Sequence, residues 1–169
     1  MTAAPLVVTL LLDEAAQARF DDLRRRHFPP ERNHLAAHVT LFHALPSERS
    51  AEVLRDVSRA TARAPFPVAV TRVRFLGRGV AYDLAAPELD ALRAELAAAW
   101  APWLTPQDSR RFAAHVTVQN KVDPERARAL HAELAAAPPL PDATATGVAV
   151  WRYLGGPWEA VAASPLRGD

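Results

Sequence analysis

The pentapeptide AAHVT occurs twice in the chain, at residues 36–40 and again at residues 113–117. Alanine and valine are common throughout the sequence, so the informative part of the repeat is the shared His-x-Thr. It places His38 and His115 77 residues apart in a chain of 169 residues. A motif that returns once in each half is typical of a duplicated unit, which restricts the chain to folds made of two similar parts.

The likeness between the two halves continues beyond the pentapeptide. Gly77 follows His38 by 39 residues, and Gly155 follows His115 by 40. Two longer pairs of stretches also align: HVTLFHALPSERSAEVL with HVTVQNKVDPERARALH, and RVRFLG with VWRYLG. We therefore expect one domain over residues 1–169, with pseudo-repeat lobes at approximately 1–78 and 79–169, related by a pseudo-two-fold axis.

Each half predicts the same order of elements: strand, helix, His-x-Thr strand, helix, strand. Short apolar or alternating runs predict strands at residues 6–12, 35–42, 66–76, 80–84, 114–119 and 147–153. Helical spacing of apolar residues, with capping residues or prolines at the ends, predicts helices between Asp13 and Pro29, over residues 46–64 and 88–100, and from Asp123 onward.

Composition excludes several classes of function. A net charge of +1 argues against salt-driven binding to long nucleic acid, which needs many basic residues on one face. The absence of cysteine removes thiolate nucleophiles and Cys-ligated metals. The apolar run at residues 6–12 ends at acidic residues and is far shorter than a membrane span, so we expect neither a signal peptide nor a membrane protein. We expect a cytoplasmic monomer.

The His-x-Thr strands each predict one polar and one apolar face. Residues i and i+2 of a strand point to the same side, so His38, Thr40 and Phe42 are expected on one face. His115, Thr117 and Gln119 are expected on one face by the same rule in the second half. A polar face directed away from the helices suggests that the two strands line a water-filled groove.

Two imidazoles and two hydroxyls in symmetric positions are suited to displacement at phosphorus. An imidazole titrates near neutral pH, so one can act as base while the other acts as acid. A threonine hydroxyl can donate to a non-bridging phosphate oxygen and fix the phosphorus between the imidazoles. This chemistry requires no metal, and we expect no cofactor.

On these motifs the chain resembles the two-histidine (2H) phosphoesterase superfamily, which includes 2′-5′ RNA ligase-like proteins and cyclic nucleotide phosphodiesterases. HVTL at His38 and HVTV at His115 both match its His-x-Thr/Ser-x pattern. The resemblance implies a duplicated α+β fold, with antiparallel sheets lining a central groove and helices packed outside. It also implies an acid/base pair of His38 and His115, phosphate binding by Thr40 and Thr117, and cleavage of 2′,3′-cyclic phosphates or related ribose phosphodiesters of nucleotides or RNA ends.

Ligase-like relatives usually carry a proline before the second histidine and an arginine close to it. Here Ala113 and Ala114 precede His115, and the nearest arginines are Arg110 and Arg111. This departure favours a phosphodiesterase over a ligase. Two alternatives stay open: a module that binds RNA ends or nucleotides without catalysis, and an RNA 2′-5′ ligase.

Further candidates surround the two motifs. Phe42 and Tyr82 are candidates for stacking on a nucleobase, and Arg111 and Lys121 for binding a second phosphate. The four tryptophans are expected mainly to pack in the core. The spacing of His34, His38 and His43 does not predict a metal site, because His38 is expected on a strand and no carboxylate accompanies the three histidines.

Overall fold

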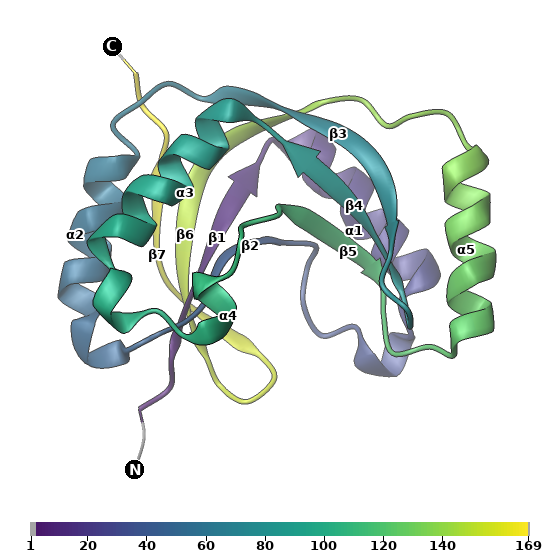
Figure 1. Cartoon of the computed structure of the whole chain (residues 1–169), viewed down its shortest axis with the longest axis horizontal. Helices are drawn as coiled ribbons and strands as arrows, with labels where there is room; N and C mark the ends of the chain where they lie inside the picture. Colours follow the sequence, from purple (N-terminus) through teal and green to yellow (C-terminus); the bar gives the residue numbers. More distant parts are fainter. Residues whose placement is uncertain (1–2, 169) are drawn as a thin grey trace.

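In the computed structural model, which describes residues 3–168, the elements follow the repeated order (Figure 1). The first repeat contributes β1 (Leu6–Leu12), α1 (Glu14–His27), β2 (Val39–Leu45), α2 (Ser50–Ala60) and β3 (Phe66–Phe75). The second contributes β4 (Val80–Ala85), α3 (Pro87–Ala99), α4 (Pro106–Ser109), β5 (His115–Gln119), α5 (Pro124–Ala136), β6 (Ala143–Tyr153) and β7 (Trp158–Pro165). The strands pair antiparallel and the helices lie outside them, so the predicted α+β fold is confirmed.

The helix starts follow from local sequence. Asp13 caps α1 by accepting a hydrogen bond from the backbone N–H of Ala16 at 3.2 Å. Asp123 caps α5 in the same way, accepting from the N–H of Arg126 at 2.9 Å. In each case a side-chain carboxylate satisfies a backbone donor that the first helical turn leaves free. Both helix starts agree with those expected from the sequence.

The strands form two groups that meet along a short seam. Their order is β2-β1-β6-β3-β4-β5, and β7 pairs with β6. Only residues 66–68 of β3 pair with β6, at residues 143–145, and β3 then turns away to pair with β4. We call the β2-β1-β6-β7 group lobe A and the β3-β4-β5 group lobe B.

The two repeats exchange elements between these lobes. Helix α1 of the first repeat covers lobe B, where the rings of Phe20 and Tyr82 lie 5.9 Å apart. Helix α3 of the second repeat lies over lobe A, where the ring of Trp100 at its end lies 4.8 Å from that of Phe42. Strands β3 and β6 are exchanged as well. The expected boundary near residue 78 therefore divides the sequence repeats, whereas each lobe in space contains elements of both.

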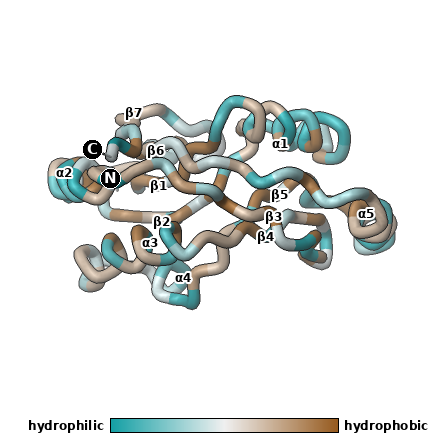
Figure 2. The backbone as a smooth tube through the Cα atoms, turned by 90° about the horizontal axis from the view of Figure 1, so that it is seen from above, coloured by the Kyte–Doolittle hydropathy of each residue, from teal (hydrophilic) through white to brown (hydrophobic). Residues whose placement is uncertain are grey.

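Apolar residues concentrate where the helices meet the strands. Figure 2 shows hydrophobic colour on the strands in the middle of the molecule, whereas α1 and α2 carry much hydrophilic colour. The largest fully buried side chains come from both repeats and include Trp100, Phe20, Phe42, Leu41 and Leu92. No helix within residues 3–168 has the length and apolar character needed to cross a membrane.

Three elements differ in their bounds from the prediction. Strand β6 begins at Ala143, four residues before the expected start at residue 147. The strand expected from residue 35 begins only at Val39, because side chains of α1 bind the backbone before it: Gln17 Nε2 donates to Ala37 O at 2.8 Å, and Ala37 N donates to Asp21 Oδ1 at 2.8 Å. The helix expected over residues 46–64 is shorter, since a 3-10 turn precedes α2 and α2 ends at Ala60.

Strand β7 is an element that the sequence does not predict, although its hairpin repeats an earlier one. Gly77 and Gly155 both have positive φ, 91° and 89°, a conformation that favours glycine. In the first hairpin Leu76 N donates to Gly79 O, and in the second Leu154 N donates to Pro157 O. The chain thus adds a further strand after β6, just as β4 follows β3.

Candidate active site

Each of the two motif histidines is held by the same local hydrogen bond. His38 Nδ1 lies 2.8 Å from Ala36 O, and His115 Nδ1 lies 3.0 Å from Ala113 O. A carbonyl oxygen only accepts, so the proton of each neutral imidazole must sit on Nδ1. Both rings have the same tautomer, and in each ring Nε2 makes no hydrogen bond to any of residues 3–168 and can meet a substrate.

The two motifs meet where lobe A approaches lobe B. Strands β2 and β5 are in contact, and Val39, Val116 and His38 border one narrow gap in the packing that has no room for a water molecule. Arg24 of α1 connects β5 with the segment before β2, donating from Nη1 to Thr117 O at 2.9 Å and from Nε to Asn33 Oδ1 at 3.2 Å. The fold thus brings the motifs together although 77 residues separate them in sequence.

The surroundings of His38 disfavour its charged form. Burial is the largest effect lowering its pKa below the ordinary value near 6.5, and the carbonyl of Ala36 opposes it. The positive charges of Arg24, His115 and His43 lower the pKa further. His38 therefore tends to be neutral, with an unprotonated Nε2 that can accept a proton.

Thr40 and Thr117 occupy equivalent, half-buried positions on the two strands. Thr40 lies opposite Thr9 of β1, and Thr117 lies opposite Ala81 of β4. Within residues 3–168 neither threonine hydroxyl makes a hydrogen bond. Both hydroxyls are therefore available to a ligand beside the histidines.

The prediction that Phe42 shares the face of His38 is wrong. Thr40 pairs with Thr9, but Phe42 pairs with Val8, so β2 has one extra residue at Leu41. This β-bulge turns the next side chain to the other face of the sheet. Phe42 is accordingly 0 % exposed, packed under α3, and it cannot stack on a nucleobase in this structure.

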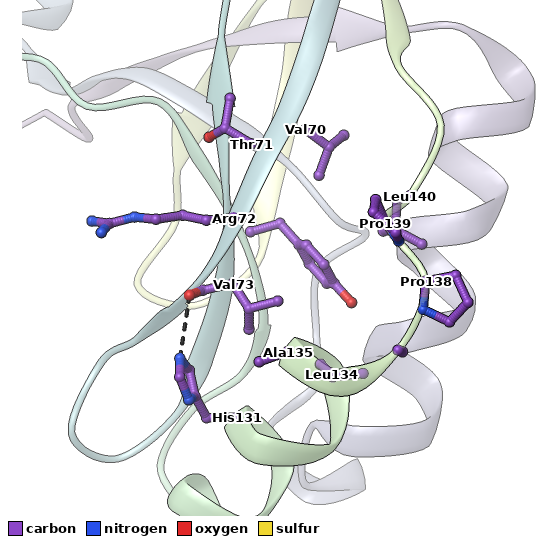
Figure 3. Close-up of a pocket in the computed structure, with 12 residues that line it drawn as sticks. Val70, Thr71, Arg72, Val73, His131, Leu134, Ala135, Pro138, Pro139 and Leu140 are labelled. Atoms are coloured by element: carbon purple, nitrogen blue, oxygen red, sulfur yellow. Dashed lines mark hydrogen bonds between the residues drawn. The ribbon is translucent and has the colours of Figure 1, made fainter.

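Tyr82 is also placed on the helix side of its sheet. It pairs with Val116, is 5 % exposed, and its pKa is raised by burial. Its ring borders a cavity of about 300 Å³ between β3 and α5, shown in Figure 3 with Val73 and His131 at the rim. The expectation that Tyr82 stacks on a base beside the histidines is therefore not supported by its position.

The two predicted cationic residues lie on either side of β5. Arg111 is exposed in the segment before β5, four residues from His115. Lys121 is exposed in the turn after β5, at the opposite end from His115, where Val122 N bonds to Arg78 O. Only Arg111 is close to the second motif along the chain.

Two tryptophans that were expected to pack in the core instead border the site. The rings of Trp158 and His38 lie 4.7 Å apart, and Trp151 Nε1 donates to Thr9 Oγ1 at 2.9 Å. Both indoles line a cavity of about 590 Å³ beside His38, together with Asp21 and Gln17 of α1. A cavity of this size with aromatic walls can take a nucleoside.

Sequence reasoning also missed three charged residues on the His115 side. Arg72 and Arg74 of β3 and Asp83 of β4 lie in the cross-strand rows that contain His115 and Thr117. The alternation of arginines in TRVRF is the sequence signal, but it becomes informative only when the pairing of β3, β4 and β5 is known. Within residues 3–168 no three His, Asp or Glu side chains are grouped to hold a metal ion.

Comparison with known proteins gives a family and several similar structures. A sequence model described as the 2'-5' RNA ligase superfamily matches residues 12–157. The structure of TT0787 of Thermus thermophilus is similar with a TM-score of 0.66 and 20% sequence identity, over 98% of this chain and 99% of that chain. No curated protein sequence matches the chain.

Two further similar structures contain ligands. LigT of E. coli complexed with 3'-AMP has a TM-score of 0.65 and 16% identity, covering 97% of this chain and 98% of that chain. LigT of E. coli complexed with phosphate has a TM-score of 0.63 and 17% identity, covering 98% of this chain and 99% of that chain. At these identities the likeness establishes a shared fold.

Proposed function

Because the chain belongs to the 2'-5' RNA ligase superfamily, we propose that it is a metal-independent phosphodiesterase that opens 2′,3′-cyclic phosphates of nucleotides or RNA ends. The observation that carries the proposal is the matched pair of imidazoles, each with Nδ1–H bound to a carbonyl and Nε2 free. Such a pair can remove one proton and supply another in the same displacement.

The proposed reaction assigns a different role to each histidine. His38, whose pKa is lowered, takes a proton from water through Nε2. The water oxygen bonds to phosphorus, the bond from phosphorus to one ribose oxygen breaks, and His115, entering as imidazolium, gives that oxygen its Nε2 proton. The product is a 2′- or 3′-phosphate monoester. Afterwards His38 is protonated and His115 is neutral, and exchange with solvent restores both.

Thr40 and Thr117 would hold the non-bridging oxygens while negative charge grows on them. The nucleoside would extend from the phosphate into the cavity walled by Trp151 and Trp158, which lies next to His38. LigT, whose fold is similar, has been crystallised with 3'-AMP, a nucleotide with a ribose phosphate monoester. A cytoplasmic monomer stays our expectation for location and assembly.

The test is hydrolysis of 2′,3′-cyclic AMP by the wild type, His38→Ala and His115→Ala, with the position of the product phosphate identified. We expect each variant to lose on the order of 10² to 10⁴ in rate, and EDTA to leave the wild-type rate unchanged. His131→Gln is a matched control, because His131 lies on α5 and bonds to Val73 O away from both motifs.

Strict dependence on a metal ion, or full activity in either alanine variant, would refute the mechanism. Binding without turnover would instead favour a non-catalytic module that recognises nucleotides or RNA ends. Incubation with cleaved tRNA halves, followed by a search for a 2′-5′ junction, separates hydrolysis from ligation.

A further inference from the structure

A row of residues on lobe B extends the site beyond His115. Arg72 pairs with Asp83, and Asp83 pairs with His115; in the next row Arg74 pairs with Ala81, and Ala81 with Thr117. Directly opposite residues of antiparallel strands project from the same face. The two arginines therefore lie on the face of the sheet that carries the second motif.

The intervening residues agree with this arrangement. Val73 pairs with Tyr82, which pairs with Val116, and these three side chains lie on the helix side. Figure 3 shows Val73 directed toward the cavity next to α5 and Arg72 extended away from it. Alternation along β3 thus separates an apolar face from a cationic one.

Asp83 holds both guanidinium groups through their Nε atoms. Arg72 Nε donates to Asp83 Oδ2 at 2.6 Å, and Arg74 Nε lies 2.5 Å from Asp83 Oδ1. The carboxylate is nearly buried, and the Arg72 side chain is 72% exposed. Within residues 3–168 the Nη atoms of both arginines make no hydrogen bond, and the Arg74 side chain is 26% exposed.

The charges of this cluster do not cancel. Two guanidinium groups and one carboxylate leave one positive charge beside His115, which enters the proposed reaction as a cation. A bound anion would balance this charge, and arginine with free Nη donors is suited to phosphate oxygens. The reacting phosphate is already assigned to Thr40 and Thr117, so the cluster is left for another anionic group.

We propose that Arg72 and Arg74 form a subsite for a second phosphate of the substrate, one that is not cleaved. The proposal rests on the proposed function, and it adds that the natural substrate carries at least two phosphates. The Cα atoms of Arg72 and His115 are two strand spacings apart, about 10 Å, and the arginine side chain shortens the gap. The second phosphate is either the neighbouring phosphodiester of an RNA end or a 5′-phosphate on the same nucleoside.

The test compares kcat/KM on three substrates. They are 2′,3′-cyclic AMP, its 5′-phosphorylated form, and the RNA dinucleotide ApA with a 2′,3′-cyclic phosphate at its 3′ end. Arg72→Gln and Arg74→Gln are the variants, and Arg25→Gln is the control, since Arg25 is an exposed arginine of α1 paired with Asp22. Arg72 is exposed enough for its replacement to leave the fold intact.

We expect each variant to lose about tenfold or more on a substrate with two phosphates and less than about twofold on 2′,3′-cyclic AMP. The salt dependence of kcat/KM on the two-phosphate substrate should also become weaker, because one phosphate contact is lost. The two-phosphate substrate that shows the loss identifies the source of the second phosphate.

An equal loss on all three substrates, or no loss on any, would overturn the subsite while leaving the proposed function in place. If the wild type turned over none of the three, the proposed function would fail and the subsite with it. Loss in the Arg25→Gln control comparable to that in Arg72→Gln would show a general effect of charge and would also overturn the subsite.

Discussion

Each motif histidine owes its orientation to a carbonyl two residues before it, and this interaction is local in sequence. The AAH tripeptide supplies the carbonyl in both copies, from Ala36 and from Ala113. Because the acceptor is a backbone carbonyl, which every residue carries, this hydrogen bond does not itself require alanine at either position. What differs between the copies is the environment, because burial and nearby cations lower the pKa of His38.

The lowered pKa of His38 predicts a pH profile. If His38 is the base, the acid limb of kcat/KM should lie below the ordinary histidine value near 6.5. An acid limb at or above 6.5 would exclude His38 as the base.

The same shift affects stability. In the unfolded chain His38 binds a proton near pH 6.5, whereas in the folded chain it resists protonation to lower pH, so stability falls as pH drops below 6.5. The free energy of unfolding can be measured with urea at about pH 7 and about pH 5, on either side of that value. Its decrease from the higher to the lower pH should be smaller for His38→Gln than for the wild type. Burial also lowers the pKa of His27, but that contribution is present in both proteins and cancels in the comparison.

Thr40 and Thr117 are predicted to act mainly on the transition state. Replacing either by valine keeps the shape and β-branching but removes the hydroxyl donor. We expect kcat to fall on the order of 10² for each, with little change in the urea midpoint, because neither hydroxyl bonds within residues 3–168. A large loss of stability with unchanged kcat would show that the hydroxyls are structural.

At the scale of elements, the bulge in β2 is held by two buried charged residues of the second repeat. Arg93 of α3 donates to Leu41 O at 2.9 Å and to Asp108 O at 2.8 Å. Asp108 of α4 accepts from the backbone N–H groups of His43 and Ala44 at 2.8 and 3.1 Å. The bulge frees backbone groups that a regular strand would pair, and these side chains satisfy them.

Asp108→Asn should destabilise the protein by about 2 kcal/mol. Burial alone would raise the pKa of Asp108, but the hydrogen bonds from the ring and backbone of His43 and from Ala44 N outweigh it and lower the pKa. An amide offers only one acceptor oxygen to these donors, so some stay unpaired. Urea unfolding checks the value, with the exposed Asp142→Asn as control; equal stability of the two variants would contradict this role.

At the scale of the whole molecule, the exchange of α1, α3, β3 and β6 ties the repeats together. Arg24 of the first repeat bonds to Thr117 O, and Arg93 of the second bonds to Leu41 O, so each helix supports the motif strand of the other half. We propose that residues 1–169 fold as one cooperative unit despite the internal repeat.

This interlocking predicts how separated halves behave. Fragments 1–78 and 79–169 should each be largely unfolded alone. Each lacks the helix that covers its motif strand, and each lacks the next strand of its sheet, since β1 pairs with β6 and β4 pairs with β3 of the other fragment. Mixed together, they should recover native circular dichroism and phosphodiesterase activity. A fragment that folds cooperatively by itself would show that the lobes are independent.

The sequence by itself determined what depends on short-range pattern: the repeated order of strands and helices up to β6, the caps at Asp13 and Asp123, and the presence of one His-x-Thr strand in each half. Periodicity and capping act over a few residues, so they can be read from the chain. The tertiary structure decided the rest. The bulge at Leu41 buried Phe42, strand pairing placed Arg72 beside the His115 row, and the added hairpin brought Trp158 to His38. Each of these depends on contacts between residues far apart in sequence, and no local pattern specifies such contacts.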